Sequence, residues 1–217
     1  MSSNALPYKY ISIEGNIGSG KTSLCEILAR RYNSELILEQ FADNPFLPYF
    51  YEDPVRYAFT VELFFMTERH KQLQHSLLSP NLFSDYYISD YIFWKSIIFG
   101  RRNLDEQEYR LLQNLFNILN SNFPNPDLLV YLHRSPAKLL QLIKERGRHY
   151  ESAISSEYLS GIQDSYFEFF KSQLSYPILI LEVENVDFVN NEQHCDEILY
   201  LLRQQYLPGV HRISLHL

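Results

Sequence analysis

Short runs of apolar residues alternate along this chain with longer stretches of helical character. The short runs predict five β-strands, at residues 8–13, 36–38, 86–89, 128–132 and 178–183. The last two runs are apolar throughout, which is typical of parallel strands that are buried on both faces. The longer stretches predict helices at residues 23–30, 54–78, 105–121, 135–146 and 155–174.

This order of strands and helices predicts the fold class. Alternating strands and helices form parallel pairs, so we expect an α/β protein whose parallel sheet carries helices on both faces. No repeat, low-complexity tract or linker interrupts residues 1–217, which predicts a single domain. Residues 208–217 show no clear pattern, and we expect them to fray.

Composition narrows the range of partners. The chain has 217 residues and a formal net charge of −7, which argues against binding a nucleic-acid backbone as its main role. No apolar run reaches the length that a membrane-spanning helix needs. The two cysteines, Cys25 and Cys195, lie far apart without metal-binding spacing, which fits a reducing compartment. Because the first residues do not look like a signal peptide either, we expect a cytoplasmic location.

The loop after the first predicted strand carries the clearest chemical signal. It fits the phosphate-binding pattern G-x-x-x-x-G-K-T and consists of Gly15, Asn16, Ile17, Gly18, Ser19, Gly20, Lys21 and Thr22. Its glycines let the backbone wrap a phosphate chain, and the following helix directs N–H groups and its positive dipole end at the same anion. Lysine can reach the β- and γ-phosphates, and the threonine hydroxyl can serve Mg²⁺. The loop therefore predicts binding of a nucleoside triphosphate.

Charged residues follow other predicted strands and one predicted helix. Glu39 and Asp90 come just after the second and third strands, where the ligands of parallel sheets bind. Glu39 is placed to hold an acceptor hydroxyl, and Asp90 to reach Mg²⁺ or its waters. Arg146 and Arg148 flank Gly147, and two arginines on a short hinged segment could close over a triphosphate as a lid. The same pair also fits a helix C-terminus that places cations on its dipole.

Four sequence blocks make the chain resemble the deoxyribonucleoside kinase family from about residue 8 to about residue 174. They are the glycine loop, EQFADNPFLPYFYEDP at 39–54, YAFTVE at 57–62 followed by Arg69, and RGRHYE at 146–151. The loop is shared by many enzymes, whereas the second and fourth blocks together are more specific. The resemblance implies a three-layer P-loop kinase fold with a five-stranded parallel sheet and a short lid near residues 146–151. It also implies that ATP phosphorylates the 5′-hydroxyl of a deoxyribonucleoside, as in nucleotide salvage.

The resemblance further implies roles for individual residues. The acceptor of the 5′-hydroxyl proton is Glu39, and the groups that stabilise phosphoryl charge are Lys21, Arg146 and Arg148. The groups that serve Mg²⁺, the implied cofactor, are Thr22 and Asp90. The nucleoside contacts are Glu39, Tyr51, Glu62, Arg69, Asp90 and Glu151. Among these, Tyr51 and Glu151 would hydrogen-bond the 3′-hydroxyl, and a tyrosine packed beneath carbon 2 of the sugar would favour deoxyribose.

The chain departs from the family pattern just after the third strand. The family usually has an arginine after the acidic residue, whereas this chain has Tyr91 after Asp90. One cation near the transferring phosphate must therefore come from elsewhere. Lys95 is a candidate because it lies one turn along the following helix, and a lower turnover is the other expected consequence.

A second departure concerns the base. Glu62 stands where the family typically has a glutamine, and an ionised carboxylate only accepts hydrogen bonds. It suits an edge rich in donors, such as guanine N1–H and N2–H₂. It could also accept from the amino group of adenine or cytosine, but the adjacent ring nitrogen would then need a donor. Arg69, on the same helix face, is expected to pair with Glu62 or to supply that donor. Phe93 and Phe123 are candidates to stack on the base.

Other functions remain open at this point. A nucleoside monophosphate kinase of the thymidylate kinase type shares the loop, but it relies on the arginine that is missing at Tyr91. A non-catalytic nucleotide-binding protein is the second alternative. A GTP-driven switch is disfavoured because the chain has no Asn-Lys-x-Asp motif. The family is commonly dimeric, and the predicted helices at 54–78 and 105–121 are long and apolar enough to form a homodimer interface.

Overall fold

The computed structural model describes residues 5–39, 44–78, 83–120 and 123–215. Within them, six strands form one sheet in the order β2-β3-β1-β4-β5-β6, and every neighbouring pair is parallel. The strands are β1 (Tyr10–Gly15), β2 (Ser34–Ile37), β3 (Tyr86–Ser89), β4 (Leu128–His133), β5 (Pro177–Glu182) and β6 (Gly209–Ser214). The helices are α1 (Lys21–Arg31), α2 (Leu47–Glu52), α3 (Pro54–Leu78), α4 (Lys95–Asn103), α5 (Glu106–Leu119), α6 (Pro136–Arg146), α7 (Ser156–Ser172) and α8 (Glu192–Leu202), with a 3₁₀ turn at His149–Glu151.

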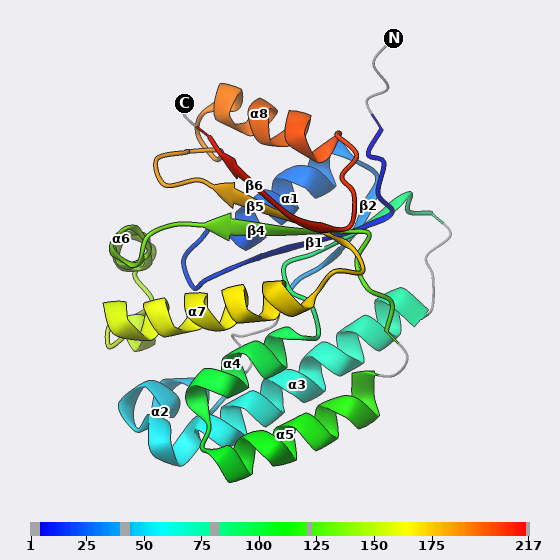
Figure 1. The fold of residues 1–217 in the computed structure, drawn as a ribbon. Coiled ribbons are helices and arrows are strands. Elements are labelled where there is room, and N and C mark those ends of the chain that lie inside the picture. The colour runs from blue at the N-terminus through cyan, green and yellow to red at the C-terminus, as the bar shows by residue number, and fades with distance from the viewer. Residues whose placement is uncertain (1–4, 40–43, 79–82, 121–122, 216–217) are drawn as a thin grey trace.

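Helices cover both faces of the sheet, as the order of elements predicts (Figure 1). Helices α1 and α8 pack on one face, where Leu28 and Ile198 join Ile13 of β1 in a buried cluster. Helices α4 and α7 lie on the other face, where Tyr166 of α7 packs against Tyr131 of β4. Helices α3 and α5 lie farther out on that second side and bury a further apolar cluster with Tyr91 and Phe93.

All five predicted strands are present, and the sheet has one strand more than predicted. Strand β6 runs parallel to β5, so the expectation that residues 208–217 fray is wrong for Gly209–Ser214. Half-buried and exposed residues alternate along this edge strand. Polar residues occupy positions of both kinds, so the alternation cannot be seen in the sequence. Helices α2 and α8 were not predicted either, and the helix expected after Asp90 had no predicted bounds and begins at Lys95 rather than one turn before it. Helix α3 has the bounds that the sequence predicts, Pro54–Leu78.

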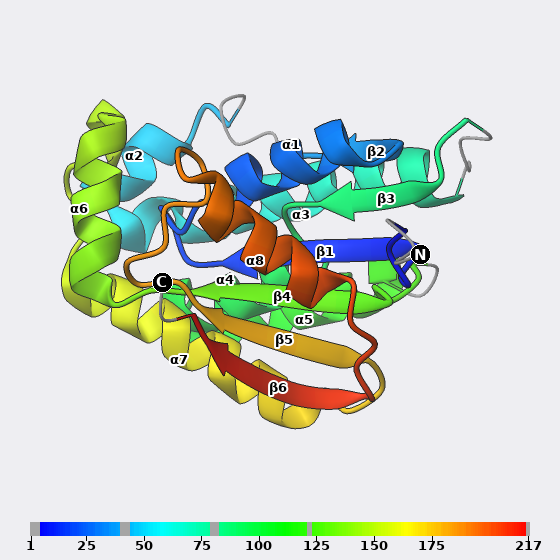
Figure 2. The same cartoon turned by 90° about the horizontal axis from the view of Figure 1, so that it is seen from above.

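The carboxyl ends of the strands meet at one edge of the molecule (Figure 2). Helices α2 and α6 lie at this edge, and the glycine loop and the residues after β2, β3 and β4 converge there. Local signals fix α6: Ser135 caps its first turn by accepting from the Lys138 N–H. Gly147 ends it with φ 73°, a left-handed conformation that glycine adopts without strain. The arginines beside Gly147 are thereby brought to the ligand edge.

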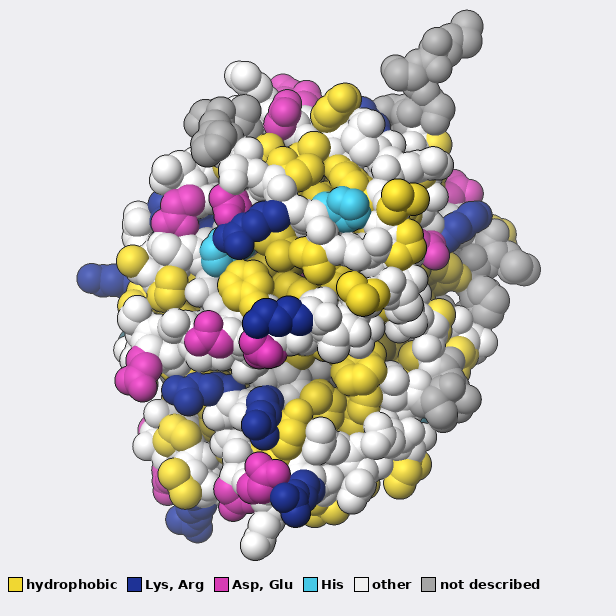
Figure 3. Space-filling view, in the orientation of Figure 1, with side chains coloured by type: hydrophobic (Ala, Val, Ile, Leu, Met, Phe, Trp, Pro, Cys, Tyr) yellow, Lys and Arg dark blue, Asp and Glu magenta, His cyan; other side chains and the backbone are white. Residues whose placement is uncertain are grey.

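Surface charge agrees with the composition. On the face shown in Figure 3, Lys and Arg side chains alternate with Asp and Glu, so that face carries no continuous basic patch. Across the described ranges, no helix is both long enough and apolar enough to cross a membrane.

Candidate active site

The glycine loop joins β1 to α1 and exposes the N-terminus of the helix. Gly18 and Gly20 have φ of 81° and 96°, values that residues with a Cβ rarely adopt. Gly20 caps α1 without a side-chain hydrogen bond, and no acidic residue lies in the first turn. The Asn16 Nδ2 donates to the Leu159 carbonyl at 2.8 Å, which ties the loop to α7. The loop is thus a fixed set of N–H groups with no internal anion, as phosphate binding requires.

Lys21 lies over this loop, with its Nζ donating to the Asn16 carbonyl at 2.9 Å. Burial, and then the positive charge of Lys95, lowers the pKa of Lys21 to about 8, while nearby carboxylates oppose the shift. A phosphate chain would stabilise the charged form further.

Thr22 and Asp90 form a pair of oxygen groups beside the loop. The Thr22 Oγ1 donates to Asp90 Oδ2 at 2.6 Å, and the Glu39 N–H donates to Asp90 Oδ1 at 2.7 Å. Asp90 therefore links the ends of β2 and β3 to the start of α1. A hydroxyl and a carboxylate next to a phosphate loop are the kind of ligands that Mg²⁺ uses together with substrate phosphates and water. These residues fit the cofactor that the sequence predicts.

Glu39 projects into a cavity next to the loop, where two cations hold it. Arg69 of α3 donates to Glu39 Oε1 through Nε at 2.7 Å and Nη2 at 2.5 Å, and Lys95 of α4 contacts Oε2 at 2.6 Å. Burial alone would raise the pKa of Glu39, but Arg69 and Lys95 outweigh it and lower the pKa to about 2. The carboxylate is therefore ionised at neutral pH and fixed in direction.

The residue after Asp90 does not reach the cavity. Tyr91 is fully buried, and its hydroxyl donates to Gln72 Oε1 at 2.7 Å. The Ile92 N–H is held by Glu14 Oε1 at 2.9 Å, which fixes the course of this segment. The sequence placed Lys95 one turn farther on as a candidate replacement for the missing arginine, and the structure brings its ammonium group to Glu39.

Farther inside the cavity, α3 contributes Glu62, which is only 2% exposed. The Asn103 Nδ2 donates to Glu62 Oε1 at 2.6 Å, whereas Oε2 is buried and has no hydrogen-bond partner among the described residues. Burial raises the pKa of Glu62 to about 7, against the lowering influence of Arg69 and of the Asn103 hydrogen bond. Arg69 donates hydrogen bonds to Glu39 and to Ser96 Oγ, so it supports Glu39 rather than forming the expected hydrogen-bonded pair with Glu62.

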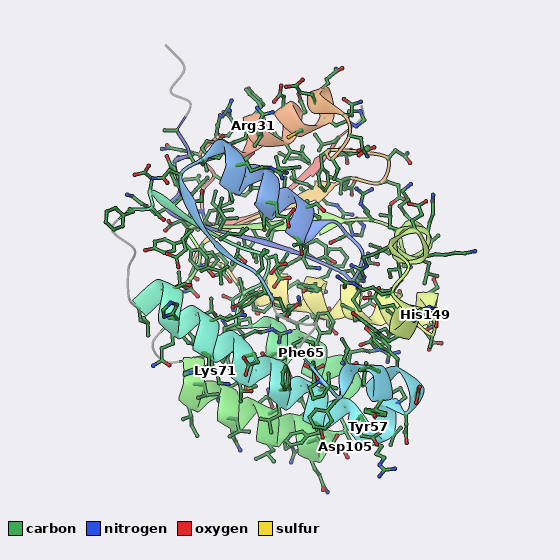
Figure 4. All side chains as sticks on the ribbon, turned by 180° about the vertical axis from the view of Figure 1, so that it is seen from behind. Arg31, Tyr57, Phe65, Lys71, Asp105 and His149 are labelled. Atoms are coloured by element: carbon green, nitrogen blue, oxygen red, sulfur yellow. The ribbon has the colours of Figure 1, made fainter. Side chains whose placement is uncertain are left out.

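The two rings that the sequence suggested for stacking on the base are not among those that line the cavity. The lining rings are Phe50, Tyr51, Phe65, Phe99 and Tyr158. Phe93 stacks on Phe116 in the core, with Phe123 against its edge, so neither is placed to stack on a base. In Figure 4, Phe65 lies midway along α3, and Tyr57 marks the end of that helix near α2.

The lid segment closes the same cavity from the end of α6. Glu151 is 5% exposed and contacts Arg146 Nη2 at 2.5 Å and Arg148 Nη1 at 3.3 Å. Tyr150 stacks on Tyr51 of α2 with a centroid distance of 6.1 Å. Figure 4 shows the neighbouring His149 at the same end of the molecule as Tyr57. The predicted lid residues are thus brought together with Tyr51.

A second, more open cavity lies on the other side of the glycine loop. It is lined by the loop, by Arg134, by Lys138 of α6 and by residues 185–190 after β5. Sequence reasoning did not identify residues 185–190, and their place after a strand at the ligand edge was the available signal. Arg134 holds that segment through bonds to the Glu184 and Val186 carbonyls at 3.0 and 2.9 Å. The two cavities meet at five residues that line both of them: Gly18, Lys21, Thr22, Arg146 and Arg148.

Two cavities that meet at a phosphate loop, with an ionised carboxylate on the inner side, define a P-loop phosphotransferase. The family model for deoxynucleoside kinase matches residues 11–206. The chain belongs to the deoxynucleoside kinase family, and it is a phosphotransferase that acts on a nucleoside hydroxyl.

Individual relatives agree with this assignment. A deoxyguanosine kinase of Bacillus subtilis is 31% identical over 87% of this chain and 93% of that protein. A deoxyadenosine kinase of Dictyostelium discoideum is 31% identical over 85% of this chain and 75% of that protein. Among solved structures, deoxyadenosine kinase from M. mycoides with bound dATP superimposes with a TM-score of 0.77 at 25% identity, covering 90% of this chain and all of that one.

Proposed function

We propose that Glu39 is the general base in the transfer of the ATP γ-phosphoryl group to the 5′-hydroxyl of a deoxyribonucleoside. The observation that carries this proposal is the ionised carboxylate of Glu39, fixed by Arg69 and Lys95 in the cavity that adjoins the glycine loop. The bond from the 5′-oxygen to the γ-phosphorus forms as the bond from that phosphorus to the bridging oxygen of ADP breaks. The hydroxyl proton passes to Glu39. A weakly basic carboxylate suffices, because phosphoryl transfer depends mainly on positioning and charge stabilisation.

The phosphate chain is held from two sides in this proposal. The loop N–H groups and Lys21 bind the β- and γ-phosphates, and Arg146 and Arg148 close over them from the lid. Thr22 and Asp90 would hold Mg²⁺, which neutralises phosphate charge when bound. Because Glu151 pairs with both lid arginines, it sets the direction of their guanidinium groups as well as lying near the sugar.

The inner cavity receives the nucleoside. Tyr51 and Glu151, which come together beside the lid, are proposed to bind the 3′-hydroxyl, and Tyr51 to pack beneath carbon 2 of the sugar. Glu62 is proposed to bind the Watson–Crick edge of the base through its unpartnered Oε2. Purine deoxynucleosides are the first substrates to test, because the relatives described above are named as deoxyguanosine and deoxyadenosine kinases.

We also propose a cytoplasmic homodimer. Leu111 and Ile118 are 50% and 72% exposed on one face of α5, seven positions apart, so that they form an apolar strip. Two copies of this face would bury the strip, and sedimentation would measure the mass. The cysteines Cys25 and Cys195 are both free and buried, which fits a reducing compartment.

The test of this function is a substrate panel with purified protein. Mg-ATP and each of the four natural deoxynucleosides, their ribose counterparts and a deoxynucleoside monophosphate are assayed by release of ADP. Transfer to a deoxynucleoside is expected, and transfer only to the monophosphate would instead support the thymidylate kinase alternative. Glu39→Gln should lower kcat by about a hundredfold or more while leaving ATP affinity unchanged. The matched control is Glu26→Gln on the exposed face of α1, which should leave both quantities unchanged.

A further inference from the structure

A cation at position 91, directly after Asp90, could not reach the cavity. Tyr91 lies in the apolar cluster beneath α3, and the Ser89 Oγ donates to its carbonyl at 2.8 Å. Glu14, itself fully buried, holds the next N–H and accepts from the Tyr166 hydroxyl at 2.7 Å. These contacts direct the side chain at position 91 toward α3 and away from the phosphate loop. An arginine there would be buried among apolar side chains.

A cation enters the cavity from the next helix instead. Lys95 is the first residue of α4 and is 4% exposed, yet its Nζ contacts Glu39 Oε2 at 2.6 Å. The ammonium group also lies 5.6 Å from the ring centroid of Phe99. Lysines are rarely so completely excluded from solvent, because desolvating the charge costs free energy. Packing alone does not account for Lys95, because an apolar chain of the same length would fill this space without that cost.

Lys95 is surrounded by charged groups in the cavity beside the glycine loop. Lys95 is attracted by Glu39, Glu14 and Asp90, and it is repelled by Arg69. After burial, the positive charge of Lys95 also lowers the pKa of Lys21. Lys21 and Lys95 line the same cavity as Glu39 and Asp90, so both cations lie beside the glycine loop.

We propose that Lys95 supplies the phosphoryl-stabilising cation that the family usually carries as an arginine at position 91. This inference rests on the proposed function of Glu39. Before transfer, Lys95 and Arg69 hold the two oxygens of Glu39 and aim the carboxylate at the acceptor hydroxyl. When the hydroxyl proton moves to Glu39, the carboxylate charge disappears, and the ammonium charge is left to act on the transferring phosphoryl oxygens. An ammonium group has three donors, so it can bond Glu39 and a phosphoryl oxygen at once.

The experiment compares Lys95→Met and Lys95→Arg with the wild-type enzyme at saturating Mg-ATP. Lys95→Met keeps the length and packing of the side chain but removes its charge. We expect its kcat to fall by about a hundredfold, the usual effect of losing one transition-state donor, with the nucleoside KM changed by less than about threefold. Lys95→Arg restores the charge and should regain at least about a tenth of the wild-type kcat. The control is Lys71→Met, whose lysine on α3 is 69% exposed and does not line the cavity, and it should match wild type.

A second measurement separates a charge effect from a folding effect. Lys95→Ala leaves a space that n-propylammonium can enter, and added amine should raise kcat toward that of Lys95→Arg. A wild-type kcat in Lys95→Met would overturn the role of Lys95. So would a loss of activity that neither arginine nor propylammonium relieves, because the lysine would then be purely structural. If the wild-type enzyme phosphorylates no deoxynucleoside, the proposed function itself fails. This outcome is distinct from a failure of the Lys95 proposal, which is judged from variants of an active enzyme.

Discussion

The titration of Glu62 should make base preference depend on pH. Its carboxyl group is buried, one oxygen is bound by Asn103, and the other lacks a partner within the described part of the chain. Burial raises its pKa to about 7. The ionised form offers two acceptors, which match guanine N1–H and N2–H₂. The neutral form offers a donor and an acceptor, which match adenine N1 and its amino group.

The sign and size of the effect follow from that pKa. Because the pKa is raised, the neutral form dominates below about pH 7 and the ionised form above it. Between about pH 6 and about pH 8, the neutral fraction falls roughly tenfold and the ionised fraction rises roughly tenfold. The ratio of kcat/KM for deoxyadenosine to that for deoxyguanosine should therefore fall by up to about a hundredfold. Taking a ratio at each pH cancels the titration of groups that serve both substrates.

The assay measures both substrates in competition with Mg-ATP, with the two monophosphate products separated by chromatography. Glu62→Gln is the matched control, because its amide keeps a donor and an acceptor at every pH and should hold the ratio constant in favour of deoxyadenosine. Glu68→Gln, on the same helix but outside the cavity lining, should keep the wild-type dependence. A wild-type ratio that stays as constant as that of Glu62→Gln between those pH values would falsify the assignment of Glu62 to the base.

Two further substitutions test the sugar contact and the core. Tyr51→Phe should raise the KM for deoxynucleosides by roughly threefold to tenfold, which corresponds to the free energy of one lost hydrogen bond. The KM for 2′,3′-dideoxynucleosides, which lack the 3′-hydroxyl, should not change. An equal rise for both kinds of substrate would remove the 3′-hydroxyl contact. Tyr131→Phe should leave the free energy of unfolding unchanged or raise it by up to about 1 kcal/mol, because the Tyr131 hydroxyl is buried without a hydrogen-bond partner among the described residues. Urea denaturation measures this, and a loss above about 1 kcal/mol would reveal a partner for that hydroxyl.

Local sequence signals predicted the parts of the fold that depend on neighbouring residues. The glycine loop could be located from its spacing, and α6 from its Ser-Pro start and its glycine stop. Strand β6 was missed because its half-buried positions are Gly209, His211 and Ile213 while Val210 is exposed, so the sequence shows neither an apolar run nor a regular polar–apolar alternation. The start of α4 was not placed at Lys95, because a buried lysine and a buried serine look like surface residues in the sequence.

The remaining contacts of the candidate site depend on packing between segments that are far apart in the sequence. The proximity of Glu39 and Asp90 could be predicted because strand ends converge in a parallel sheet, whereas the partners of Glu39 depend on how α3 and α4 pack. Asn103 could not be linked to Glu62 from spacing, since it is the last residue of a helix whose end was not predicted. Arg69 was expected to pair with Glu62 or to supply a donor to the base, because the two residues share a helix face. Its hydrogen bond to Glu39 depends on how α3 packs against the end of β2, which spacing does not show.

A lysine at position 95, in place of the family's arginine at position 91, shows that a sequence motif is not the same as the charge that it supplies. The motif is defined by sequence, and by that measure this chain lacks a cation after β3. The reaction requires only a positive charge within reach of Glu39 and the phosphate, and a helix that begins beside the strand end can supply it one turn later. Tyr91 is then free to fill the apolar space beneath α3, where its hydroxyl finds Gln72. A search for the arginine alone would classify the chain as inactive, whereas the position of the Lys95 ammonium group predicts an active kinase.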